Sequence, residues 1–299
     1  MKKLFIMLKF NLIILFFTFQ LNAQKTGCNY IIDYYPIVYE GQIEYLKGDF
    51  DKAYDFFDKA RYKCELLNNQ DILESVIFAE LSAKRGLFEQ AFDYLRNAVK
   101  DGFYFGYLEG NDNLNLLKSR LEWNLLKNEA DSLAILFKKT DRNNLRSEII
   151  SMINEDQKVR IDKVPSEMQK IDGKHEMRIK EIFNSYGYPN SKLIGGSTPS
   201  QNVDISTMLM HFSDVEYFEP ILLEFIRNGE CSPSVLANMV DSNDRKRNLF
   251  TYGIYDNLDS TLIKDFKNLN ARRTAIGLRT LEQHKETRNL IIQKYRSKN

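Results

Sequence analysis

The sequence predicts an all-α fold in two parts, and three observations support this prediction. Apolar residues recur at helical spacing along most of the chain, strand-like alternation is scarce, and one segment with the character of a helix hairpin occurs twice in the first half. The composition, 43% hydrophobic and 28% charged, is that of an ordinary folded protein of one or two domains. Only residues 248–255 indicate a strand.

The first 23 residues have the layout of a secretory signal peptide. A pair of lysines precedes an apolar run at residues 10–19, and the small Ala23 follows it. Because Lys9 and Asn11 interrupt the apolar stretch, its unbroken part is shorter than the roughly 20 residues that a membrane-spanning helix needs. We therefore expect cleavage after Ala23 and export to the periplasm or the outer surface, with an uncleaved anchor as the alternative.

The charge of the mature chain is close to balanced. Beyond Ala23 there are 39 Lys and Arg residues against 41 Asp and Glu, which gives a formal net charge of −2. Such a balance provides no general attraction for nucleic acids or for acidic membranes. We expect no nucleic-acid partner and no stable membrane insertion once the signal peptide is removed.

Three cysteines remain in the mature chain, namely Cys28, Cys64 and Cys231. In an oxidising compartment, Cys28 and Cys64 can form a disulfide that ties the N-terminal segment to the first repeated unit and leaves Cys231 over. The alternative is that all three are free, buried thiols.

The segment "GDFDKAYDFFDKA" at residues 48–60 returns 38 positions later as "GLFEQAFDYLRNA". On a helix, Ala53, Phe57 and Ala60 lie on one face, where the small alanines let a neighbouring helix approach and the aromatic ring fills the remaining space. The glycine that opens each segment allows a tight turn from a preceding helix. Each unit is therefore predicted to be a helix hairpin, whose first helices lie at about residues 36–47 and 71–85.

This pattern, over about residues 36–100, resembles the tetratricopeptide repeat, whose period is about 34 residues. The resemblance implies a short array of stacked hairpins with a concave face that binds a peptide or a protein. Only two units are visible, whereas about three are usually needed to bury a continuous core. Residues 100–126 and a helix at 120–138 are therefore expected to cover the open end of the array. Trp123 is expected in the core of this cap. The repeat domain then spans residues 24–138.

A polar, turn-rich segment at residues 138–144 marks a predicted boundary, and a second, mainly helical domain follows over residues 145–299. Helical periodicity predicts its helices at 145–162, 167–187, 203–212, 215–228 and 280–296, with another that starts at Ser232 and Pro233.

Five local motifs of this second domain are similar, in order and spacing, to an uncharacterised bacterial domain family of unknown function. They are "EDQKVR" at 155–160, "YGYP" at 186–189, "MHFSD" at 210–214, "YGIYDN" at 252–257 and "NARRTAIGL" at 270–278. The family pattern reads DQxxR, YGxP, HxD, YGT and RRxxxGL, and the resemblance covers about residues 145–285. It implies no activity. The chain departs from the pattern in the longer spacing of His211 and Asp214 and in Ile254, where the family tends to have threonine.

The candidate catalytic residues are His211, Asp214 and Asp156. A histidine can act as a general acid or base when a carboxylate, here Asp214 or Asp156, orients its ring. The alternative for Asp214 is that it caps the helix beginning at Val215 while His211 packs nearby. Asp156 and Arg160, four residues apart on a helix, are alternatively a structural ion pair.

The candidate ligand-binding residues are Arg160, Tyr252, Arg272 and Arg273, since guanidinium groups next to tyrosines can bind an anion. Alternatively, Arg272 and Arg273 hold the last helix to the domain through carboxylates. The histidines are few and widely spaced, and no CxxC or HExxH motif is present, so no metal and no cofactor is predicted. A mixed site of His211 with Asp156 or Asp244 is the alternative.

Two functions are consistent with these patterns. The first is an exported protein-interaction scaffold that binds a peptide or protein through the repeat domain. The second is an enzyme or small-ligand-binding protein with a polar site around His211 in the C-terminal domain. The second function is favoured if one pocket brings together His211, Asp156, Arg160, Tyr252 and Arg273.

Overall fold

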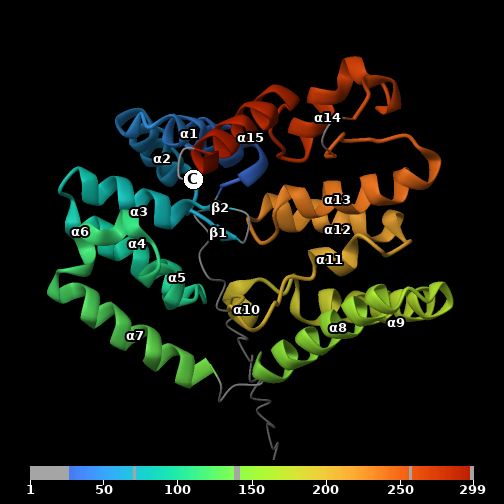
Figure 1. Ribbon diagram of the computed structural model, residues 1–299, viewed down its shortest axis with the longest axis horizontal. Coiled ribbons are helices and arrows are strands. Elements are labelled where there is room, and N and C mark those ends of the chain that lie inside the picture. Colours follow the sequence, from blue (N-terminus) through green and yellow to red (C-terminus); the bar gives the residue numbers. More distant parts are fainter. Residues whose placement is uncertain (1–26, 70–71, 138–141, 256–257, 297–299) are drawn as a thin grey trace, which may run out of the picture.

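The computed structural model describes residues 27–69, 72–137, 142–255 and 258–296 (Figure 1). The predicted all-α fold is confirmed, since helices make up most of this part of the chain. The strands named within it are the two-residue β1 (Asn68–Asn69) and β2 (Ile72–Leu73), which pair antiparallel. The predicted signal peptide, residues 1–23, lies outside the described residues.

The two predicted hairpins are present in the first half. They consist of the π-helical turn η1 (Tyr30–Tyr34) with α1 (Tyr35–Lys47) and α2 (Phe50–Lys63), and of α3 (Glu74–Lys84) with α4 (Phe88–Lys100). The glycine between the helices of each hairpin has a positive φ, +86° at Gly48 and +75° at Gly86, which explains why both segments open with this residue. Ala53, Phe57 and Ala60 have no exposed surface, so the predicted inner face of α2 is confirmed.

The predicted cap follows the second hairpin. Its elements are α5 (Phe105–Glu109), η2 (Asp112–Leu114), α6 (Asn115–Lys118) and α7 (Leu121–Phe137). Trp123 is buried and its ring centroid lies 5.4 Å from that of Phe105, so its predicted place in the core of the cap is confirmed. The cap and the second hairpin share one hydrophobic cluster.

The second half contains a long hairpin and a series of shorter helices. Its elements are α8 (Arg142–Asp162), α9 (Pro165–Tyr186), α10 (Ser191–Ile194), α11 (Ser206–Leu209), α12 (Val215–Arg227), α13 (Pro233–Asp244), η3 (Arg245–Arg247), η4 (Ser260–Leu262), η5 (Phe266–Asn268), α14 (Leu269–Ala275) and α15 (Leu281–Arg296). The Ser232 side chain caps α13, as predicted, and Pro233 occupies its first turn. The helix expected at 203–212 is shorter than predicted.

The strand indicated at residues 248–255 is a wrong prediction. Phe250 forms only an isolated parallel bridge with Ile263. The next backbone N–H groups, those of Thr251 and Tyr252, donate instead to the buried carboxylate of Asp241. These donors are therefore not available to a strand ladder.

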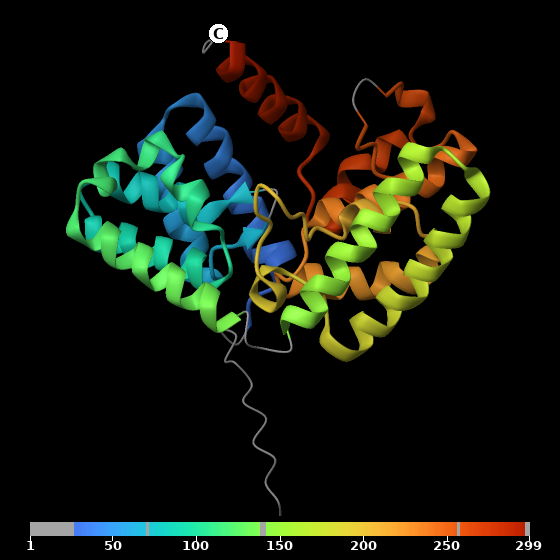
Figure 2. The same ribbon diagram turned by 60° about the horizontal axis from the view of Figure 1, so that its bottom comes forward.

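The described chain forms two lobes (Figures 1 and 2). The N-terminal lobe holds the helices from α1 to α7, and the C-terminal lobe holds those from α8 to α14. Figure 2 shows α15 between the two lobes. Along this helix, Gln283 donates to the Glu40 carboxylate at 2.7 Å, and Glu286 pairs with Lys47 at 2.9 Å, so α15 packs back onto α1.

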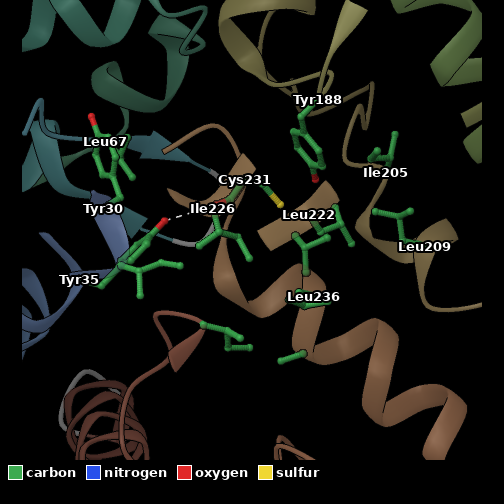
Figure 3. Packing of buried hydrophobic residues seen from close by; sticks show 14 of the residues in the cluster. Tyr30, Tyr35, Leu67, Tyr188, Ile205, Leu209, Leu222, Ile226, Cys231 and Leu236 are labelled. Atoms are coloured by element: carbon green, nitrogen blue, oxygen red, sulfur yellow. Dashed lines mark hydrogen bonds between the residues drawn. The ribbon is translucent and has the colours of Figure 1, made fainter. Parts of the chain in front are cut away.

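One hydrophobic cluster crosses from lobe to lobe. It combines Tyr30, Tyr34 and Tyr35 with residues of the C-terminal lobe such as Ile226 and Leu236. Figure 3 shows this packing and the hydrogen bond that the Tyr35 hydroxyl donates to the carbonyl oxygen of Cys231, at 3.4 Å. The first hairpin therefore shares its core with the second half of the chain.

A disulfide joins Cys28 to Cys64, with a Cα–Cα distance of 5.5 Å, whereas Cys231 is buried and takes no part in a disulfide. The disulfide fixes the segment that leads into η1 against the end of α2. No helix of the described residues has the length and the apolar character needed to cross a membrane.

Candidate functional site

Asp156 and Arg160 form part of an ion-pair network between α8 and α9. Arg160 donates through Nη2 to Asp156 at 2.9 Å and also to Asp172 of α9. Asp156 is buried, and its second oxygen accepts a hydrogen bond from the Gln157 amide at 2.9 Å. The predicted pairing of Asp156 with Arg160 is thus present, and it ties two helices together.

His211 lies close to this network, at the end of the turn formed by α11. The protein around the exposed imidazole removes part of its solvation and lowers the pKa of His211, and the charge of Arg160 acts in the same direction. Asp156 and Asp172 oppose this shift. A lowered pKa favours the neutral imidazole near neutral pH, which is the form that accepts a proton.

Asp214 does not orient His211 through any hydrogen bond in the described structure. One of its oxygens accepts from the Tyr217 N–H at 3.2 Å and so caps α12, while the other accepts from Lys180 at 2.6 Å. The hydrogen bond from Lys180 lowers the pKa of Asp214, and the Tyr217 N–H adds to the effect. This geometry matches the capping alternative stated from the sequence.

Asp241 was missed by the reasoning from sequence. Its carboxylate is fully buried and accepts three backbone N–H groups of the loop after α13, from Thr251 at 2.9 Å, Tyr252 at 2.8 Å and Ile254 at 3.0 Å. Burial raises the pKa of Asp241, although these three donors act against the shift. The signal in the sequence was an acidic residue on the apolar face of a predicted helix, four positions after Ala237.

Arg273 holds the same loop from the other side. It is only 1% exposed, and it donates to the carbonyl oxygens of Tyr252 at 2.6 Å and Arg279 at 2.7 Å. Arg272 donates to the carbonyl oxygens of Thr251 at 3.1 Å and Asp265 at 3.0 Å, and to that of Lys264. The two guanidinium groups therefore hold the chain mainly through backbone carbonyls.

Tyr252 is buried in this region, and burial raises its pKa to about 12. No described hydrogen bond or ion pair joins Tyr252, Arg272 or Arg273 to the network of Asp156 and Arg160. The sequence-predicted candidates therefore do not meet in one site. Asp156 and Arg160 form one group with His211 close by, Tyr252, Arg272 and Arg273 form a second, and Asp214 belongs to neither. Within the described part of the chain, no three His, Cys, Asp or Glu side chains are placed to hold a metal ion.

A large cleft in the described structure lies elsewhere, and none of the seven candidate residues lines it. Its volume is about 1170 Å³. One wall comes from the ends of α2 and α4 and the segment between α2 and α3, with Arg61, Asn97 and Asp101. The opposite wall comes from the C-terminal lobe, with Tyr188 after α9 and Asn238 of α13. Both lobes thus contribute to the walls of one cleft.

The lining of this cleft is polar and balanced in charge. Its uncharged members include five asparagines, five serines and four tyrosines. Its charged members are Arg61, Lys100, Arg142 and Lys192 on the basic side and Glu65, Asp101, Asp204 and Glu230 on the acidic side. Tyrosine provides a large, stiff contact surface, and asparagine and serine provide adaptable hydrogen bonds. Such a surface suits a ligand with many polar groups and little net charge.

The first helices of the two hairpins are largely covered by the chain itself. The helix α15 packs on α1, and the Asn111 amide next to η2 donates to the buried Glu80 of α3 at 2.6 Å. Tyr45 of α1 donates to the same carboxylate at 2.5 Å. A partner that docks on this face therefore has to displace α15, whereas the cleft between the lobes is open.

Comparison of the chain with protein-family models, with curated proteins and with solved structures gives no match. The two resemblances stated from the sequence therefore stay predictions.

Proposed function

We propose that this chain is an exported scaffold that binds a peptide or a segment of another protein in the cleft between its lobes. The observation that carries the proposal is the cleft itself, because its polar, charge-balanced walls come from both lobes. Its volume of about 1170 Å³ lies above the roughly 300–1,000 Å³ that is common for sites of small molecules. An extended peptide, with its regular donors and acceptors, suits such a lining.

In this proposal the repeat domain still contributes to binding, but through the cleft wall and not through the concave face expected from the sequence. The ends of α2 and α4 form one wall of the cleft, with Tyr94, Asn97 and Lys100 of α4 among the lining residues. Docking on α1 and α3 is less favourable because it competes with the contacts that α15 makes with α1, including the pair of Lys47 and Glu286.

The second candidate function is an enzyme or a small-ligand-binding protein with its polar site around His211. The observation in its favour is an exposed imidazole with a lowered pKa next to a fixed network of Arg160, Asp156 and Asp172. In this case His211 is the acid or base, and Arg160 and Asp156 are positioning residues. No substrate follows from this arrangement.

The experiment that separates the two compares what co-purifies with the mature chain from cell envelopes. Asn97 lines the cleft and is exposed, so Asn97→Trp narrows the cleft without disturbing the core. Asn128→Trp is the matched control, because Asn128 is exposed on α7 and does not line the cleft. His211→Asn removes the imidazole.

We expect a peptide or protein partner that is retained by wild type, by Asn128→Trp and by His211→Asn and is lost with Asn97→Trp. The partner is identified by mass spectrometry and its binding is repeated with purified components. A bound molecule that is lost with His211→Asn and retained with Asn97→Trp contradicts the scaffold and supports the second candidate.

A further inference from the structure

Glu230 stands at a fixed position on the wall of the cleft. The connection from α12 to α13 is closed by two backbone hydrogen bonds, from Glu230 to the Phe225 carbonyl at 2.8 Å and from Gly229 to the Ile226 carbonyl at 3.1 Å. With Gly229 at a φ of +74°, this is a Schellman motif. A Cβ atom added at Gly229 would lie only 2.7 Å from the ring of Tyr30, so the N-terminal lobe packs directly on this turn.

The Glu230 carboxylate differs from the other three carboxylates of the cleft. Glu65 and Asp101 lie 3.5 and 3.6 Å from the amino group of Lys192, and Asp204 accepts from the Ser206 hydroxyl at 2.7 Å. Glu230 has no side-chain hydrogen bond or ion pair with any described residue. It is therefore a half-buried acid whose charge is not matched by a neighbouring cation.

The electrostatic surroundings of Glu230 are unfavourable for its charge. Burial raises the pKa of Glu230, and the negative charge of Glu224 adds to the effect. A bound cation offsets both the lost solvation and the repulsion, because an opposite charge within a few ångströms favours the ionised carboxyl group.

Aromatic rings lie in the same region of the cleft wall as this carboxylate. A Cβ atom added at Gly187 would lie 4.0 Å from the Glu230 Oε2 and 4.0 Å from the Phe225 Cε1, so both groups border the same space. The ring of Phe225 is in turn 5.9 Å, between centroids, from that of Tyr188, which lines the cleft. A carboxylate that shares its surroundings with aromatic rings suits an ammonium or guanidinium group on an apolar stem, which gains from both the charge and the rings.

We propose that Glu230 binds a lysine or arginine side chain of the peptide segment that occupies the cleft. This inference rests on the proposed function and names the chemistry of the partner. A metal ion suits the site less well, because a hard cation is held by several oxygen ligands, and Glu230 provides one carboxylate without a described partner.

The test uses a random heptapeptide library displayed on phage and the immobilised mature chain. Selection is carried out on wild type, Glu230→Gln, Glu230→Lys and the matched control Glu65→Gln, whose carboxylate is exposed and already lies near Lys192. Each variant is first shown to keep the wild-type elution volume and cooperative thermal unfolding. Because Glu230→Gln removes a charge that burial disfavours, we expect its Tm to equal or exceed that of wild type.

We expect wild type and Glu65→Gln to select peptides with a recurrent lysine or arginine. Glu230→Gln loses this preference, and Glu230→Lys selects aspartate or glutamate at the same place. A peptide selected on wild type should bind Glu230→Gln roughly 10- to 100-fold more weakly, at or below the low end of the cost of losing one partner of a buried charge pair, because Glu230 is only half-buried. Peptides without a basic preference, or with one that Glu230→Gln retains, refute the role of Glu230 and leave cleft binding intact. If no peptide is enriched on wild type, the proposed function and this inference both fail.

Discussion

The hydroxyl of Tyr35 in the first hairpin donates to the carbonyl oxygen of Cys231, across 196 positions of the sequence and at a distance of 3.4 Å. This bond lies inside a hydrophobic cluster that contains residues of both lobes, among them Tyr34 and Leu236. The two lobes are therefore joined by a common core, and the position of the cleft walls depends on it.

From this shared core we predict that residues 24–138 are unstable when expressed alone. Without the C-terminal lobe, the fragment exposes Tyr30, which packs near Gly229, and Tyr35, which packs near Gly277, and burial of each large apolar side chain contributes about 1.5–3 kcal/mol. We expect the fragment to show a much lower urea midpoint than the mature chain, or no cooperative transition, by circular dichroism. A fragment as stable as the mature chain contradicts a common core.

We predict that Asp241→Asn lowers the free energy of unfolding by about 1–3 kcal/mol. The substitution replaces one of the accepting oxygens by an amide NH2 group, which is itself a donor and faces a backbone N–H donor. The backbone groups that donate to this carboxylate are the N–H groups of Thr251, Tyr252 and Ile254. Urea unfolding measures this change. Asp259→Asn is the control, since Asp259 caps only the short turn η4. An equally large loss of unfolding free energy in this control contradicts the role predicted for Asp241.

The buried Glu80 should make stability depend on pH. Burial raises its pKa above the usual 4.5, although hydrogen bonds from Tyr45 and Asn111 act against the shift. The folded state then binds the proton more tightly than the unfolded state, so this stabilisation is complete below the unfolded pKa and is lost as pH rises through the folded pKa. We expect wild type to lose more stability than Glu80→Gln between pH 4 and pH 7, measured by urea unfolding. Equal losses contradict the prediction.

Reduction of the disulfide between Cys28 and Cys64 should destabilise the chain by about 3–4 kcal/mol, since the bond closes a loop over a sequence separation of 36. The variant Cys28→Ser with Cys64→Ala gives the same comparison without a reductant, by urea unfolding. Thiol titration of the denatured, unreduced mature chain should detect one thiol, that of Cys231, and three after reduction. Three thiols before reduction contradict the disulfide.

Local features of this fold could be predicted from the sequence. The hairpins, the Ser232 cap and the buried Trp123 each depend on residues close in sequence, where helical period and capping chemistry apply directly. The capping role of Asp214 is also local, because its carboxylate accepts from the Tyr217 N–H, three residues further on.

Features that depend on distant residues could not be predicted in this way. The Asp241 carboxylate bonds a loop 10 to 13 residues further on, and Arg273 reaches a carbonyl 21 residues before it. The cleft needs two lobes placed by a core that no periodicity reveals. Polar residues that were candidates for chemistry, such as Arg272 and Arg273, are engaged with backbone groups that the sequence pattern does not identify.

The central claim is that a partner lies in the cleft between the lobes, and photo-crosslinking in cells tests it most directly. A photoreactive phenylalanine replaces either Tyr186, which lines the cleft and is 56% exposed, or Met177, which is 65% exposed on the same helix and does not line it. We predict a discrete crosslinked product from position 186 that disappears when Asn97→Trp is added, and none from position 177. Equal products from both positions, or a product at 186 that persists with Asn97→Trp, contradict the claim.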